Sequence, residues 1–161
     1  MLDREPITLT PSLIEPTGPA FAEISSWPYL DEFVGRLLRN DLPNRGRFNE
    51  GRIWVYRDSN GAIVGFGSLD VCNDYRDYYA DDHPHPYIPL LAVNPARRGR
   101  GFGAKIVRHL IGEAAVRVRR GGCHDVLFLE VYESSEAAIR LYTRSGFTNL
   151  TPEPIPDEAE G

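Results

Sequence analysis

The chain has 161 residues, the length of one globular domain, and its 42% hydrophobic and 25% charged residues are typical of a soluble protein with its own core. A net charge of −5 argues against nucleic acid as the main partner, because a phosphate backbone requires a basic face. The sequence contains no signal-peptide pattern and no run of 18 apolar residues, which argues against export and against a membrane span.

Two cysteines, Cys72 and Cys123, are too few and too widely spaced for a disulfide framework or a cysteine metal site. We therefore expect reduced thiols and a cytoplasmic location.

Proline residues are frequent in the first 24 positions, where only Ile7 to Thr10 suggests an edge strand. From Ser25 or Ser26 onward, apolar residues recur at helical spacing, which predicts an amphipathic helix to about Asn40. We interpret this stripe as core rather than as a ligand site. It consists of Trp27, Leu30, Phe33, Val34, Leu37 and Leu38.

An antiparallel hairpin is predicted next, because R-I-W-V-Y-R (52–57) and A-I-V-G-F-G-S-L-D-V (62–71) flank a D-S-N-G turn. Residues 72–86 then form a long loop rich in acids, tyrosines and histidines. It could attract an ammonium substrate, hold a metal through His83, His85 and the pair Asp81 and Asp82, or simply be solvated. The metal interpretation has the least support, since prolines flank His85 and no further ligand has a recognisable spacing.

A strand–loop–helix unit occupies residues 86–122. A short apolar strand, Ile88 to Val93, runs through a proline-stopped turn into a glycine-rich loop, and a helix starts on that loop and stops at Gly121 and Gly122. Such a loop directs unpaired backbone N–H groups at one point, which predicts an anion site. The pattern of neither a nucleotide P-loop nor a dinucleotide fold is present, while a plain turn and an RG-type RNA-binding patch remain open. The expected core stripe of the helix is Phe102, Ile106, Val107, Leu110, Ile111, Ala114 and Val118.

Residues 125–132 are apolar on both alternating faces, which predicts a central strand covered on both sides. Glu130 interrupts this strand. A buried carboxylate there would be costly or would titrate toward neutral pH, unless Glu130 lies at a splayed strand end and reaches water or an arginine. A last helix follows from Ser134 or Ser135 to Gly146, and Phe147 is expected to begin another strand.

Two segments together resemble the GCN5-related N-acetyltransferase (GNAT) superfamily over residues 52–149. The first is Arg98 to Gly103, an R-x-x-G-x-G pattern preceded by L-A-V-N-P. The second matches V-x-x-x-N-x-x-A-x-x-L-Y-x-x-x-G-F, with Ser135 in place of the asparagine. Its matching residues are Val131, Ala138, Leu141, Tyr142, Gly146 and Phe147.

The resemblance implies an α/β fold with a central twisted mixed sheet of about six strands and helices on both faces. It also implies one domain over residues 1–150, followed by a Pro-rich acidic tail at 151–161. Pro152, Pro154 and Pro156 cannot form the family's usual central last strand, so this strand is expected to be missing or abbreviated. Either the acceptor side would then be unusually open, or the acidic loop, the N-terminal segment or a second subunit would supply that wall. A homodimer is therefore one of the alternatives.

The resemblance further implies acetyl-CoA as acyl donor, no metal, and a primary amine of a small molecule, peptide or protein as acceptor. The donor would lie where strand 88–93 and strand 126–132 splay apart, and the amine would attack it directly in a ternary complex. The N–H of Leu91 would stabilise the oxyanion. The implied donor-binding residues are Leu91, Ala92, Val93, Arg98, Gly99, Arg100, Gly101, Phe102, Gly103, Ala104, Ser135, Ala138 and Tyr142.

In the family, a tyrosine at the position of Tyr142 commonly protonates the departing thiolate; as an alternative, Tyr142 is an apolar helix residue that packs under the sheet. L-E-V-Y-E-S-S-E-A-A-I-R-L-Y is similar to the ribosomal-protein N-terminal alanine acetyltransferases, which implies Glu130 as general base. Asp82, His83 and Asp70 are the other candidates. A non-catalytic acyl-CoA-binding or regulatory module is the alternative function.

Overall fold

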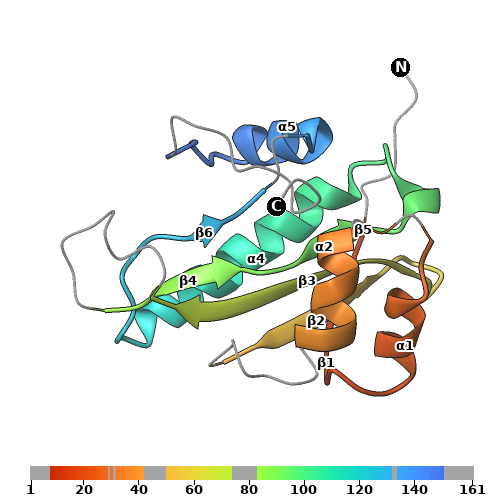
Figure 1. Cartoon of the computed structure of the whole chain (residues 1–161), viewed down its shortest axis with the longest axis horizontal. Helices are drawn as coiled ribbons and strands as arrows, with labels where there is room; N and C mark the ends of the chain where they lie inside the picture. The colour runs from red at the N-terminus through yellow and green to blue at the C-terminus, as the bar shows by residue number, and fades with distance from the viewer. Residues whose placement is uncertain are drawn as a thin grey trace.

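The computed structural model describes residues 8–28, 30, 32–41, 50–73, 83–131 and 134–150. Its strands are β1 (Thr10–Ile14), β2 (Arg52–Arg57), β3 (Ile63–Cys72), β4 (His85–Ile88), β5 (Leu91–Val93) and β6 (Phe128–Leu129). Its α-helices are α1 (Pro19–Ser25), α2 (Glu32–Arg36), α4 (Phe102–Arg119) and α5 (Glu136–Arg144). The described strands form one mixed sheet of order β1-β2-β3-β4-β6, and β5 pairs with β3 (Figure 1). The predicted α/β fold with a mixed sheet of about six strands is confirmed.

Two hydrophobic cores cover the two faces of this sheet. Successive residues of β2 point to opposite faces, so Ile53 and Val55 contribute to one core and Trp54 and Tyr56 to the other. The first core lies under α1 and the segment that follows α2, and the second lies under α4 (Figure 1). No described helix has the length and apolar character that crossing a membrane would require.

The N-terminal part departs from the prediction. An edge strand exists, but β1 spans Thr10–Ile14 instead of starting at Ile7, which lies outside the described residues. The helix predicted from Ser25 or Ser26 to about Asn40 starts only at Glu32, so its first half is wrong, and α1 was not predicted. Helix α1 ends at Ser25, and the chain leaves the helical path at Trp27 because the proline at position 28 disfavours helical geometry in the residue before it. A helix resumes at Glu32 and continues as a π-helical turn over Leu37–Asp41.

The hairpin is confirmed. Strands β2 and β3 pair antiparallel, and Gly61 in the turn has a φ of 85°, a conformation that glycine adopts readily. Loop residues 74–82, with Asp74, Asp77, Asp81, Asp82 and three tyrosines, lie outside the described residues. The loop predicted over residues 72–86 ends earlier than expected, because β4 begins at His85.

Helix α4 is confirmed, and five residues of its predicted stripe are buried: Phe102, Ile106, Val107, Leu110 and Ala114. Ile111 is 37% exposed and Val118 only half-buried, so the stripe is narrower than expected. Gly121 and Gly122, both with positive φ, follow the helix as predicted.

The predicted strand over 125–132 is wrong in length, because only Phe128–Leu129 form β6. Before it, the Val126 N–H donates to the His124 carbonyl, which turns the chain instead of extending it. Helix α5 and the positive φ of Gly146 are as expected, but Ser135 at the N-cap makes no capping bond and residues 147–150 form no strand.

Candidate active site

The site lies where two parallel strands separate. β4 and β6 pair through Tyr87 with Phe128 and through Ile88 with Leu129. Beyond these pairs, β5 is bonded only to β3 among the described strands, and Glu130 and Val131 have no strand conformation. Strands that pair at one end and then diverge leave a gap at their carboxyl ends, a position where ligands bind in open sheets. The gap is where the sequence predicted it.

The divergence coincides with a β-bulge. Asp70 pairs with Tyr87 and Gly67 pairs with Leu91, so three steps along β3 match four steps along the opposite strand. The extra residue falls at Pro89–Leu90, where proline offers no N–H and the Leu90 carbonyl accepts a bond from the Ser68 N–H. After the bulge, one edge of β5 is bonded to β3, and no described strand covers the other edge.

The loop after β5 prepares an anion site at the start of α4. Asn94 accepts a hydrogen bond from the Ala96 N–H at 3.0 Å and so caps a 3-10 turn over Pro95–Arg97. Gly99 and Gly101 then have φ values of 78° and 83°, in the left-handed region. Gly101 is the N-cap of α4, no side chain caps this helix, and its first turn holds no acid. Its first N–H groups and the positive end of its dipole therefore favour an anion.

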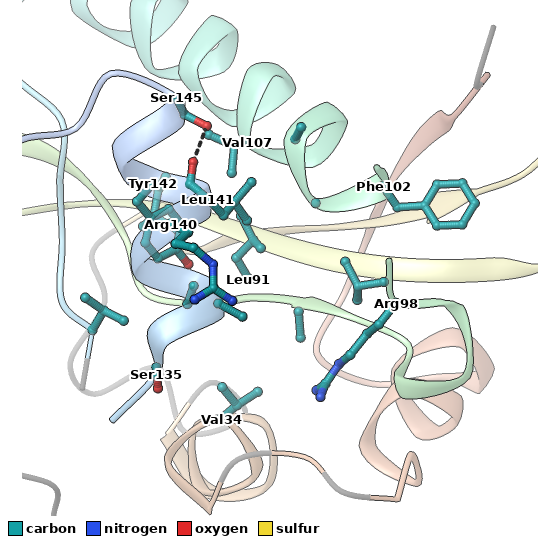
Figure 2. A pocket seen from close by; sticks show the side chains of 18 of the residues that line it. Val34, Leu91, Arg98, Phe102, Val107, Ser135, Arg140, Leu141, Tyr142 and Ser145 are labelled. Atoms are coloured by element: carbon teal, nitrogen blue, oxygen red, sulfur yellow. Dashed lines mark hydrogen bonds between the residues drawn. The ribbon is translucent and has the colours of Figure 1, made fainter. Parts of the chain in front are cut away.

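A cavity of about 1350 Å³ joins the gap, the loop and α5 (Figure 2). Every residue that the sequence assigned to the donor lines this cavity except Arg100, which is exposed. The lining thus includes Leu91, Ala92, Val93, Arg98, Gly99, Gly101, Phe102, Gly103, Ala104, Ser135, Ala138 and Tyr142.

Tyr142 belongs to α5, and its ring packs edge-on against Phe147 at a centroid distance of 5.8 Å. Burial raises the pKa of Tyr142 to about 12, so the hydroxyl stays protonated at neutral pH. This hydroxyl makes no hydrogen bond to any residue that the structure describes. Tyr142 thus presents a protonated hydroxyl in the cavity wall, and its ring packs against Phe147.

Glu130 follows β6, is exposed and lines the cavity, so the splayed strand end is the arrangement observed. Neither of the other described candidate bases, Asp70 and His83, lines the cavity. Asp70 is buried and accepts bonds from the N–H groups of Glu50 (2.8 Å) and Val71 (2.7 Å), His83 is exposed elsewhere, and Asp82 lies outside the described residues.

The described part of the acidic loop contains no group of three residues that could hold a metal. His85 is fully buried, and its Nδ1–H donates to the Pro86 carbonyl at 2.9 Å. Its ring packs on Phe128, which gives this histidine a place in the β4–β6 contact.

The family follows from a direct comparison. A model of the acetyltransferase (GNAT) family matches residues 18–147, which is most of the chain. The chain belongs to the GNAT acetyltransferase family.

Curated relatives of this GNAT chain include the N-alpha-acetyltransferase RimI of Mycobacterium tuberculosis, 32% identical over 97 residues that cover 60% of this chain and 52% of the relative. Another is the mycothiol acetyltransferase of Stackebrandtia nassauensis, 33% identical over 102 residues that cover 63% of this chain and 30% of the relative. The GNAT chain thus spans about half or less of the length of these relatives. Among solved structures, AtaTR bound with AcCoA matches with a TM-score of 0.67 at 21% identity. The match covers 90% of this chain and 87% of the chain in that structure.

Sequence reasoning missed several residues of the GNAT cavity. Leu30 and Val34, which were assigned to the core alone, pack against the first core and also line the cavity. Four arginines, at positions 97, 108, 140 and 144, were also missed. Arg97 pairs with Asp58 at 3.1 Å and so ties the loop to the β2–β3 turn. Arg140 and Arg144 lie within the second GNAT motif, and this position could have identified them from the sequence.

Proposed function

We propose that the protein is an acetyl-CoA-dependent N-acetyltransferase, which transfers the acetyl group to a primary amine of a small molecule, peptide or protein by direct attack in a ternary complex. The observation that carries this proposal is Tyr142: its hydroxyl stays protonated at neutral pH, has no hydrogen-bond partner among the described residues and shares one cavity with the free edge of β5 and the start of α4. Family membership and the AcCoA-bound structural neighbour support the choice of donor.

The donor would extend the sheet. The uncovered edge of β5, at Leu91, Ala92 and Val93, offers backbone groups to which a pantetheine arm can bond as a further strand would. The pyrophosphate fits the glycine loop, where the N–H groups from Gly101 to Ala104 and the helix dipole favour negative charge. The cavity of about 1350 Å³ exceeds the usual 300–1,000 Å³ of a small-ligand pocket, which leaves room for donor and acceptor together.

Attack requires a neutral amine. An α-amine with a pKa near 7.7 is uncharged in about one molecule in six at pH 7, and a lysine-like amine with a pKa near 10.4 in only about one in two thousand. Glu130, at the rim of the cavity, is the candidate base that accepts the proton, directly or through a water. The N–H of Leu91 would stabilise the oxyanion that forms at the thioester carbonyl.

The carbon–sulfur bond then breaks and the sulfur leaves with the electron pair. Because a thiol has a pKa near 8.5 and that of Tyr142 is about 12, the hydroxyl stabilises the departing sulfur chiefly as a hydrogen-bond donor. The proton that the amine releases ends on the sulfur, so that protons and charge balance. The products are an amide and the free CoA thiol.

The test is release of CoA from acetyl-CoA, followed with a thiol reagent across a panel of peptide α-amines, lysine-like amines and small-molecule amines. We expect release above the hydrolysis rate with at least one class. Calorimetric binding of acetyl-CoA without turnover of any amine would instead favour a non-catalytic acyl-CoA-binding module. No binding at all would contradict both functions.

A homodimer, a cytoplasmic location and a single domain over residues 1–150 with a separate tail remain predictions from the sequence. The identity of the segment that forms the wall of the acceptor site also remains a prediction.

A further inference from the structure

The wall of the cavity concentrates arginines in a chain whose net charge is negative. Arg98, Arg108, Arg140 and Arg144 line it, are exposed, and form no ion pair or hydrogen bond with the described residues. Glu130 and Glu136 are the acids of the described lining. The cationic groups therefore outnumber the acidic ones, which suits a ligand with several negative charges.

Two of these arginines are placed where they repel each other. Arg140 and Arg144 are four residues apart on α5, so their side chains share one face of the helix. Like charges at this spacing destabilise a helix, and no described carboxylate pairs with either guanidinium. A bound anion would convert this repulsion into attraction.

Helix packing brings this pair close to the glycine loop. A methyl group placed on Gly103, in the first turn of α4, would lie 3.0 Å from Cδ2 of Leu141, so α4 and α5 touch at this point. Leu141 lies between Arg140 and Arg144 in the sequence. Figure 2 shows Arg140 extending from α5 and Arg98 from the loop, on the two sides of the drawn cavity. The part of α5 that carries both arginines therefore lies beside the first turn of α4, and both arginines line the same cavity as the glycine loop.

We propose that Arg140 and Arg144, assisted by Arg108 on α4, form a second anion subsite that binds the 3′-phosphate of the acyl-CoA. This inference rests on the proposed function. The 3′-phosphate is carried by the ribose attached to the pyrophosphate, and a guanidinium presents paired N–H donors that match phosphate oxygens. The subsite selects an acyl-CoA over an acyl group carried on a phosphopantetheine arm without the nucleotide.

The test compares CoA with 3′-dephospho-CoA by calorimetry on the full chain. We expect the unmodified protein to bind CoA about tenfold or more tightly, as charge-assisted phosphate bonds would give. In the double variant Arg140→Gln and Arg144→Gln, the affinity for CoA should fall by about the same factor, while the affinity for 3′-dephospho-CoA stays constant. The melting temperature of the ligand-free double variant should change little, because the repulsion between Arg140 and Arg144 that is removed offsets the lost attraction between Glu136 and Arg140, which are also four residues apart.

Arg119→Gln is the matched control, because Arg119 is an exposed arginine of α4 that does not line the cavity. It should leave both affinities unchanged. Equal affinity of the unmodified protein for the two nucleotides, or an unchanged preference in the double variant, would overturn the subsite and leave the proposed function standing if acetyl-CoA is turned over. Failure to bind either nucleotide would overturn both proposals.

Discussion

Tyr142 shows at the scale of one residue how packing and chemistry combine. Its ring contacts Phe147, and its hydroxyl remains in the cavity without a partner among the described residues. A hydroxyl without a protein partner is available to a ligand, and the substrate can accept its hydrogen bond. The departing sulfur of the donor is the partner that we propose.

Tyr142→Phe removes only this oxygen. We expect turnover to fall by about 10²- to 10³-fold, the usual contribution of one hydrogen-bond donor to a developing negative charge. The fold should be unaffected, because the ring still packs against Phe147. Acetyl-CoA affinity by calorimetry should change little, since the bond forms mainly as charge develops on the sulfur. Unchanged turnover in Tyr142→Phe would remove Tyr142 from the mechanism.

At the scale of elements, the close packing of α4 on the sheet holds the donor site in place. Gly65 on β3 lies directly beneath α4: a methyl group there would lie 2.5 Å from Cδ1 of Ile106 and 2.9 Å from the backbone oxygen of Ala92. On the same side of the sheet, the hydroxyl of Tyr56 bonds to Nδ1 of His109 at 2.7 Å and ties β2 to α4. Strand β5 is thus fixed between β3 and the helix.

Gly65→Ala should therefore lower the free energy of unfolding by about 1–3 kcal/mol, the usual cost of overpacking a core. Because the backbone of Ala92 cannot move without shifting β5, acetyl-CoA affinity should fall as well. Denaturant unfolding and calorimetry measure the two effects.

Gly112→Ala is the control, because Gly112 lies in α4 with no atom within 4 Å of the added methyl group. It should raise stability by about 0.5–1 kcal/mol and leave acetyl-CoA binding unchanged. If both variants proved equally stable, the tight contact at Gly65 would not have the role assigned to it.

The elements that the sequence predicted well are those whose signals are local. The 3.6-residue period of α4, the turn glycine at position 61 and the Arg98–Gly103 pattern depend on neighbouring residues alone. The break at Trp27 is also local, but the effect of the following proline was underestimated. The bulge at Pro89–Leu90 and the short β6 depend on pairing between distant segments, which no local pattern reveals.

The residues of the candidate site also fall into two groups, those with a local sequence signal and those without one. Its donor residues were predicted from two motifs, and the structure brings nearly all of them to one cavity. Arg108, Arg140, Leu30 and Val34 were missed, because an exposed arginine or a helix-spaced aliphatic residue reads as ordinary surface or core until the fold places it beside the gap.

At the scale of the whole molecule, one arrangement forms the cavity: the bulge separates β5 from β6, and the resulting gap continues into the glycine loop and α5. The arrangement occurs in a member of the GNAT family, and the volume of the cavity supports the proposal that donor and acceptor bind together.

Amide hydrogen exchange with and without acetyl-CoA tests this arrangement most directly. The N–H groups of β5 and of the start of α4 should exchange more slowly when acetyl-CoA is bound, because they bond to the donor, and peptides from residues 91–104 and 134–145 should show the effect. Peptides from β1, at the far edge of the sheet, serve as the internal control and should not change. Binding of acetyl-CoA without slower exchange in residues 91–104, or with protection centred elsewhere, would contradict the account.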